Sequence, residues 1–123
     1  MVQSLDRLKE SPSQTAGPYV HIGLTPNFSG IANVYRADLG AVMVDDDTLG
    51  ERITITGRVF DGAGETLRDA VIEIWQADVS GLYRGPLEAR DRANAHFSGW
   101  GRCATDLNTG VYRFETVKPG RVP

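Results

Sequence analysis

The sequence predicts an all-β protein, an antiparallel β-sandwich with a loop-rich N-terminal arm, built as one structural domain of 123 residues. Three observations predict this fold. Residues 53–59 alternate apolar with polar side chains, which is the period of a strand that buries one face. Residues 71–75 form a second apolar strand, and the stretches 101–105 and 111–117 flank a run of turn formers. The 14 glycines supply the turns that such a fold needs.

An N-terminal arm and loop segment is expected over residues 1–50, followed by a partial β-sandwich over residues 51–123. The first ten residues are expected to fray. Residues 11–18, SPSQTAGP, are turn formers that exclude a helix or a central strand. Farther along, four apolar residues at helical spacing predict a short helix before Gly40. They are Ile31, Val34, Tyr35 and Leu39.

The second strand carries two expectations about packing. Because VIEIW is apolar on both faces except for Glu73, residues 71–75 are predicted to form a central strand with Trp75 in the core. A carboxylate within such a strand is expected to pair with an arginine, here Arg58 or Arg102.

The strands 101–105 and 111–117 are predicted to form a hairpin, because the turn DLNTG that joins them is short. Cys103, on the first of them, is expected to pack as a small apolar residue rather than to act as a reactive thiol. A long loop over residues 78–98 precedes this pair. Loops of such length are usually functional or mobile.

Composition excludes several classes of partner and site. The 16 acidic residues exceed the 13 basic ones, and the net charge of -3 argues against nucleic-acid binding. No apolar stretch approaches the roughly 20 residues that span a bilayer, and charges near the N-terminus interrupt any signal peptide. The single cysteine excludes an internal disulfide. A cytoplasmic protein without membrane contact is the expectation.

The spacing of histidines and acidic residues predicts no metal site. His21 and His96 are far apart and have no histidine or cysteine at ligand spacing, so both are expected to be hydrogen-bonded loop residues. The acidic run at residues 45–47 is interpreted as a solvated loop, because the alternating oxygen ligands of a calcium site are absent. The sequence also contains no phosphate-binding glycine motif and no nucleophile elbow.

Five collinear strings carry more information about function. They are SPSQTAGPY at residues 11–19, EIWQAD at 73–78, GLYR at 81–84, FSGWGRCATD at 97–106 and TVKPG at 116–120. Together they resemble the intradiol ring-cleavage dioxygenases, in order from residue 11 to residue 120. The resemblance implies a prealbumin-like β-sandwich in an enzyme that cleaves aromatic diols with dioxygen.

The site that this resemblance implies is a non-haem ferric ion held by two tyrosines and two histidines, since hard Fe(III) favours phenolate oxygen. Tyr83 in GLYR matches the first tyrosine, but Val122, which offers no donor atom, stands in place of the second. The two histidines belong to an R-x-A-H-I-H type string that these residues do not contain. The resemblance therefore implies no metal ligand set and no catalytic residue within this chain.

Some members of the family combine two homologous subunit types, of which only the β-type binds iron. The opening string and the loss of the second tyrosine both resemble the α-type. The resemblance implies that Fe(III) is held by a homologous β-type partner and that this chain contributes to the substrate pocket of the partner. The contributing positions are Thr15, Ala16, Gly17 and Pro18. Gly17 suits such a role because bare backbone permits close approach.

Several alternatives stay open. The resemblance implies further strands after residues 111–117. This sequence does not contain them, either as a fragment or as a natural truncation, so the sandwich is expected to be incomplete at its C-terminus. Another catechol or a hydroxyquinol is an alternative substrate. A non-enzymatic prealbumin-like binding or structural module would fit the spacing of strands and turns alone, although it has no reason to carry the string at residues 15–18. Those residues are also explained by a loop that merely needs turn formers.

Overall fold

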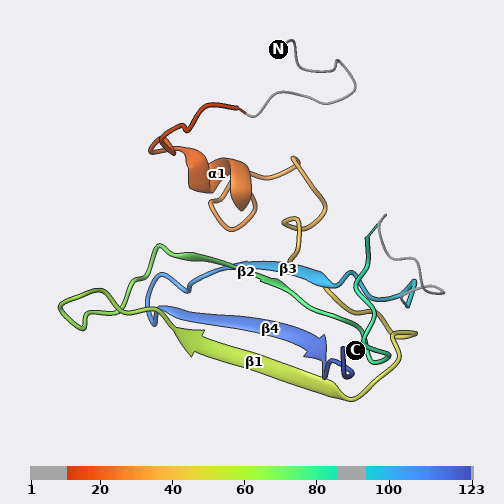
Figure 1. Cartoon of the computed structure of the whole chain (residues 1–123). Coiled ribbons are helices and arrows are strands. Elements are labelled where there is room, and N and C mark those ends of the chain that lie inside the picture. Colours follow the sequence, from red (N-terminus) through yellow and green to blue (C-terminus); the bar gives the residue numbers. More distant parts are fainter. Residues whose placement is uncertain (1–10, 86–93, 123) are drawn as a thin grey trace, which may run out of the picture.

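The computed structural model of the chain describes residues 11–85 and 94–122 (Figure 1). The ten N-terminal residues expected to fray and residues 86–93 of the long loop lie outside the described residues, as does residue 123. One short helix and four strands form within the described part. They are α1 (Val20–Leu24), β1 (Arg52–Arg58), β2 (Val71–Trp75), β3 (Trp100–Ala104) and β4 (Val111–Val117).

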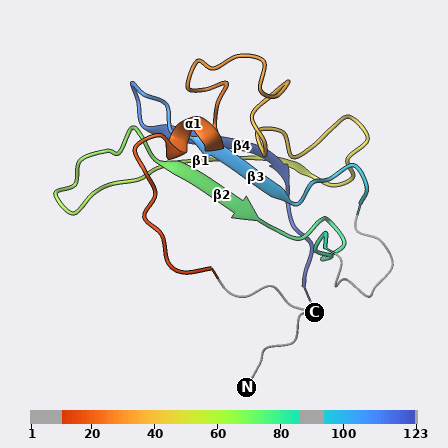
Figure 2. The same ribbon diagram turned by 90° about the horizontal axis from the view of Figure 1, so that it is seen from above.

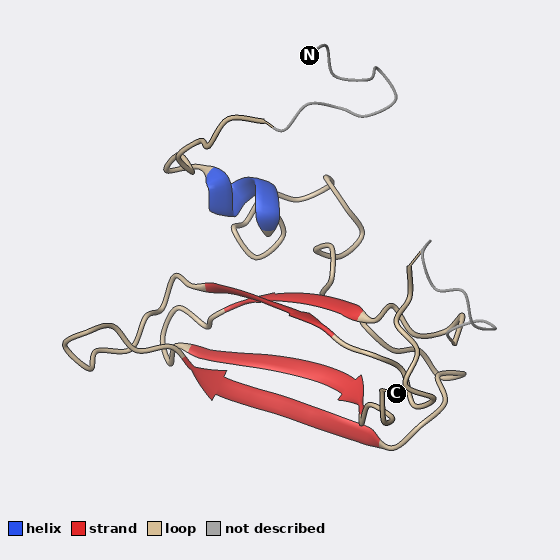
Figure 3. Cartoon of the chain, in the orientation of Figure 1, coloured by secondary structure: helices blue, strands red, loops and turns tan. Residues whose placement is uncertain are grey.

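The four strands form two antiparallel pairs that face each other as layers, β1 with β4 and β2 with β3 (Figures 1 and 3). The prediction of an all-β, antiparallel, sandwich-like fold is thereby confirmed. In β1 the burial alternates strictly from residue to residue, with Ile53 and Ile55 on the half-buried face. This is the period of two that the sequence displays over the same residues.

The predicted hairpin between the last two strands is wrong, because β3 pairs with β2 and β4 pairs with β1. The turn between them is nevertheless closed: the amide of Asp106 donates to the carbonyl of Val111 at 2.9 Å, and the amide of Gly110 donates to the carbonyl of Asp106 at 2.7 Å. Thr105 extends the β2–β3 ladder by one step beyond β3, since its amide donates to the carbonyl of Ala70 at 2.9 Å. The turn therefore carries the chain from one layer to the other.

The prediction of a central second strand with a buried tryptophan is also wrong. Within the described residues, β2 has β3 as its one strand partner, and Trp75 is 67% exposed on the outer face. The inner face presents Ile72 and Ile74. The expected partner of Glu73 is confirmed as Arg102, whose Nε donates to Oε1 of Glu73 at 2.7 Å across the register of the sheet.

A small apolar core fills the space between the layers. Its buried members are Met43, Phe97, Phe114 and Val117. Half-buried residues of both layers pack around them, among them Ile55 of β1 and Cys103 of β3, so Cys103 packs against the core as predicted. The layers are thus joined by apolar contact, the usual way in which two sheets cover each other.

The helix predicted before Gly40 does not form, and the structure has a helix at Val20–Leu24 instead. Residues 31–40 adopt turns and bends. Gly30 and Asn33 have φ of 83° and 69°, which a right-handed helix does not accommodate. The carboxylate of Asp38 folds this stretch back by accepting hydrogen bonds from the amides of Asn27 at 2.7 Å and Phe28 at 2.9 Å.

Residues 11–42, called the N-terminal segment below, lie over the outer face of the β2–β3 layer (Figures 1 and 2). Two contacts hold the segment there. Nη1 of Arg102 donates to the carbonyl of Leu24 at the end of α1 at 3.3 Å, and the amide of Arg102 donates to the carbonyl of Gly40 at 2.9 Å. The described residues contain no helix long and apolar enough to cross a membrane.

Candidate functional site

The string at residues 15–18 forms the approach to α1, where the carbonyl of Gly17 accepts a hydrogen bond from the amide of Val20 at 3.1 Å. Thr15, Ala16, Gly17 and Pro18 are all exposed. A Cβ built on Gly17 would meet no atom within 4 Å. These four positions therefore present backbone and small side chains to the surroundings, and nothing in the described part of the chain requires glycine at position 17.

A cavity of about 440 Å³ opens beside this string, between the N-terminal segment and one end of the β2–β3 layer. The N-terminal segment contributes Pro18, His21 and Phe28 to its lining, and the sheet side contributes Val71 and Leu107. His21 thus lies in a helix at a cavity rather than in a loop. No local sequence pattern indicates this cavity, because the N-terminal and sheet residues that line it are about 40–90 positions apart.

Tyr83, the match to the first tyrosine ligand, is half-buried and packs against the exposed ring of Trp75. The ring centroids are 5.0 Å apart and the planes are inclined by 58°, an arrangement that aromatic pairs favour. The buried carboxylate of Asp78 shapes the preceding turn, since its Oδ1 accepts the amides of Ser80 at 2.8 Å and Leu82 at 3.0 Å. Tyr83 is therefore presented by an ordered turn.

Val122, the match to the second tyrosine ligand, follows a segment that lies against the same turn. The amide of Gly120 donates to the carbonyl of Asp78 at 2.8 Å. Gly81 has φ of 77°, and a Cβ built on it would lie 2.1 Å from the carbonyl oxygen of Arg121. Tyr83 and Val122 therefore lie on adjoining segments, and together they offer one phenol and one aliphatic side chain.

A ferric ion does not fit this pair of positions. Valine has no donor atom, and Tyr83 supplies one phenol that is engaged in packing with Trp75. Within the described residues, the group of side chains whose donor atoms converge lies elsewhere, at Asp45, Asp47 and His96.

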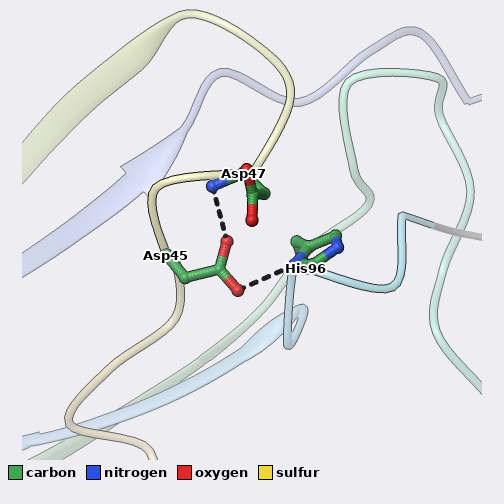
Figure 4. A group of neighbouring side chains, drawn as sticks. All are labelled: Asp45, Asp47 and His96. Carbon is green, nitrogen blue, oxygen red and sulfur yellow. Dashed lines mark hydrogen bonds and ion pairs between the residues drawn. The ribbon is translucent and has the colours of Figure 1, made fainter.

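Asp45, Asp47 and His96 point toward one another at the surface (Figure 4). Their ligating atoms all lie within 4.8 Å of one another. Nδ1 of His96 is 3.0 Å from Oδ2 of Asp45, and Oδ1 of Asp45 accepts the amide of Asp47 at 3.0 Å and the hydroxyl of Thr48 at 3.1 Å. His96 is thus a hydrogen-bonded loop residue, as predicted, and the acidic run is exposed, as predicted.

Asp45 and His96 each stabilise the charged form of the other, which shifts the pKa of both groups. The hydrogen bond from His96 lowers the pKa of the Asp45 carboxyl below its usual value of 3.8, and hydrogen bonds from Thr48 and the Asp47 amide act in the same direction. The hydrogen bond to Asp45 and then its negative charge raise the pKa of His96 above 6.5. Sequence spacing could not reveal this pair, because its members are 51 positions apart.

Comparisons with known proteins add a family and two subunit types. The sequence model of a family described as Dioxygenase matches residues 24–123. The protocatechuate 3,4-dioxygenase alpha chain of Pseudomonas putida is 43% identical over 119 residues, which cover 96% of this chain and 56% of that one. The beta chain of the same enzyme from Burkholderia cepacia is 45% identical over 78 residues, which cover 63% of this chain and 33% of that one. The chain thus spans little more than half the length of the alpha chain.

Solved structures show the same fold relationship. The dioxygenase domain of a carbohydrate-binding fusion protein from Streptomyces sp. SirexAA-E superposes with a TM-score of 0.53 at 28% identity, over 68% of this chain and 47% of that chain. An intradiol ring-cleavage dioxygenase from Tetranychus urticae superposes with a TM-score of 0.52, also at 28% identity, over 68% of this chain and 44% of that one.

Proposed function

Because the chain belongs to the intradiol dioxygenase family, we propose that it is part of an α-type subunit of protocatechuate 3,4-dioxygenase. In this role it supports the ferric site of a homologous β-type partner. The complete enzyme cleaves protocatechuate with dioxygen, between the two hydroxyl-bearing carbons, to 3-carboxy-cis,cis-muconate. The reaction belongs to the catabolism of aromatic acids, and a cytoplasmic location is part of the proposal.

One observation carries the α-type assignment. Similarity to the Pseudomonas putida alpha chain extends over 96% of this chain, whereas similarity to the Burkholderia cepacia beta chain extends over 63%. A second alpha chain, from Burkholderia cepacia, is matched over 94% at 39% identity. The chain therefore shares with alpha chains a stretch that lies outside its match to the beta chain.

The donor atoms support the same assignment. Tyr83 and Val122 offer one phenol where two would be needed, so Fe(III) of the complex is assigned to the β-type partner. The exposed residues Thr15, Ala16, Gly17 and Pro18 are available to contact that partner. Gly17 has open space around its Cα, so its backbone can approach a neighbouring subunit closely.

The first experiment combines this chain with an iron-loaded β-type subunit and follows oxygen uptake with protocatechuate. Gly17→Val in the complex should raise KM while the iron content stays unchanged, because a branched side chain enters space shaped by bare backbone. Gly62→Val is the matched control, since Gly62 also has no atom within 4 Å of an added Cβ but lies in a distant turn. Equal kinetics of the two variants would remove Gly17 from the substrate pocket.

The second experiment tests whether the chain alone is a catalyst. Tyrosinate bound to Fe(III) absorbs visible light, so the chain with added ferric salt should show no such band and should consume no oxygen with protocatechuate. Val122→Tyr should not restore activity, because the imidazole ligands are still lacking. A stoichiometric band that disappears in Tyr83→Phe, together with oxygen consumption, would overturn the assignment.

The alternatives are separated by substrate. A different catechol or a hydroxyquinol that is turned over faster than protocatechuate by the reconstituted complex would identify another intradiol dioxygenase. A non-enzymatic binding module would neither associate with the β-type subunit nor change its kinetics. Two independent measurements, association with the β-type subunit and turnover of protocatechuate, therefore test the proposal.

A further inference from the structure

The cluster of Asp45, Asp47 and His96 has no part in the proposed function, and it brings one imidazole and two carboxylates within 4.8 Å of one another. A divalent ion with donors at about 2.1 Å in a tetrahedron has those donors about 3.4 Å apart. The Asp45–His96 pair, at 3.0 Å, lies close to this spacing, and all three ligating atoms lie within 4.8 Å.

The two loops that carry these residues are fixed by contacts other than the cluster itself. Val44 and Phe97 form an antiparallel bridge immediately beside Asp45 and His96. Thr48, which is buried, shares its hydroxyl proton between the carbonyl of His96 and Oδ1 of Asp45, and its hydroxyl oxygen accepts the amide of Asp45 at 2.8 Å. The separation of the two loops is therefore set by backbone pairing, and the three side chains are held together without an ion.

The neighbouring cations leave the carboxylates available. Arg52 donates to the carbonyl of Asp45, and Arg84 donates to the carbonyls of Ala95 at 3.4 Å and Phe97 at 3.3 Å. Both arginines thus bind main-chain oxygens in these contacts. The positive charge of the two arginines partly balances the negative charge of the two carboxylates. A divalent ion would neutralise the carboxylates fully.

The donor set selects the class of ion. One imidazole nitrogen with two carboxylate oxygens suits Zn²⁺ and the neighbouring divalent transition metals. Calcium prefers six to eight oxygen donors, and magnesium prefers oxygen donors and water. A hollow of about 210 Å³, lined by Asp45, His96 and Arg84 among others, leaves room beside the cluster for a water ligand.

We propose that Asp45, Asp47 and His96 bind one divalent transition-metal ion, with Zn²⁺ as the representative, and that the ion joins the loop at residues 45–48 to the loop at residues 94–97. The ion replaces the proton shared between Asp45 and His96, so that the carboxylate oxygen and the imidazole nitrogen both become ligands and the proton leaves to solvent. Water completes the coordination, because the three residues are exposed.

The test titrates the 123-residue chain, first treated with a chelator, with Zn²⁺ in a calorimeter and with Co²⁺ in an absorption cell. We expect one Zn²⁺ per chain, a Co²⁺ spectrum of low coordination number, and no binding of Ca²⁺ under the same conditions. His96→Gln and Asp47→Asn should each weaken Zn²⁺ binding at least about tenfold, the scale of loss seen when a group at a metal site is removed. Circular dichroism of each variant confirms that it is folded.

Two matched controls make the result specific. Asp46→Asn changes the acidic residue between the two proposed ligands, and His21→Gln changes the histidine that lies in α1. Both should bind Zn²⁺ like the parent chain. Absence of Zn²⁺ binding, equal binding by the His96→Gln variant, or an Asp46→Asn loss as large as that of Asp47→Asn would each overturn the proposal.

Discussion

In the sandwich (residues 43–122), Phe97 and Val117 are 2% and 0% exposed, whereas in the N-terminal segment Tyr19 and Val42 are 76% and 68% exposed. The two regions contain similar kinds of apolar residue but use them differently. In the sandwich, alternation along the strands turns apolar side chains into the space between two layers. In the N-terminal segment, turns hold the chain and many apolar side chains face outward.

The N-terminal segment is held by polar contacts instead. The carboxylate of Asp38 binds two amides within the segment, and Arg102 of β3 binds the carbonyl at the end of α1. Such contacts position a chain but contribute less stability than a packed core. An outward-facing apolar surface of this kind is typical of protein–protein contact, which supports the proposed partnership with a second subunit.

The largest expected effect comes from the core. Phe114→Ala should lower the free energy of unfolding by about 3–5 kcal/mol, because it removes a buried ring and leaves a cavity. Tyr19→Ala in the N-terminal segment should change it by less than about 0.5 kcal/mol. Urea denaturation of both variants of the 123-residue chain measures the difference. Similar losses in the two variants would show that the N-terminal segment is part of the cooperative core.

The next effect tests the turn that carries Tyr83. Gly81→Ala should cost about 1–3 kcal/mol, since φ of 77° is strained for alanine and the new Cβ would meet the carbonyl of Arg121 at 2.1 Å. Gly17→Ala is the comparison in the N-terminal segment, where the added Cβ meets nothing within 4 Å. Its unfolding curve should match the parent. A harmless Gly81→Ala would mean that the segment after β4 does not lie against this turn.

A smaller, local effect is expected where the two regions meet. Arg102→Ala removes the donors to Leu24 and Glu73. The free energy required to open α1 locally should therefore fall by about 1 kcal/mol, while the sandwich stays folded. Amide hydrogen exchange measures this opening residue by residue. Arg113→Ala is the control, because Arg113 is an exposed arginine of β4 that pairs with Glu115. Unchanged exchange in α1 would show that other contacts anchor the N-terminal segment.

The strands could be predicted from the sequence because their information is local. The stretch 71–75 coincides with β2, and 111–117 coincides with β4. Their pairing could not be predicted, since alternation specifies a strand but not its neighbour. Trp75 shows the same limit: an apolar run of five residues does not reveal which face is covered, and the register places Trp75 opposite Trp100 on the outside.

The candidate sites divide in the same way. The positions of Tyr83 and Val122 followed from sequence strings, and the structure places them on adjoining segments. The pairing of Asp45 with His96 depends on the bridge between Val44 and Phe97, which brings residues 51 positions apart into contact. No local spacing encodes that bridge, so this cluster could be recognised only from the fold.

The smallest expected effect concerns the turn that carries the chain between the two layers of the sandwich. Hydrogen bonds from the amide of Thr109, from its hydroxyl and from the amide of Asn108 lower the pKa of the Asp106 carboxyl below its usual value of 3.8. A group whose pKa is lowered by folding stabilises the folded state above its unfolded pKa, and this stabilisation is lost as the pH falls through the folded pKa. Asp106→Asn should therefore reduce stability at neutral pH and flatten its decline below about pH 4. Thermal melts of the parent chain and the variant between pH 2 and pH 7 measure both profiles, and NMR of the Thr109 amide reports the titration directly. A Thr109 amide that responds at the same pH as an unfolded aspartate would show that the turn is formed without the Asp106 carboxylate.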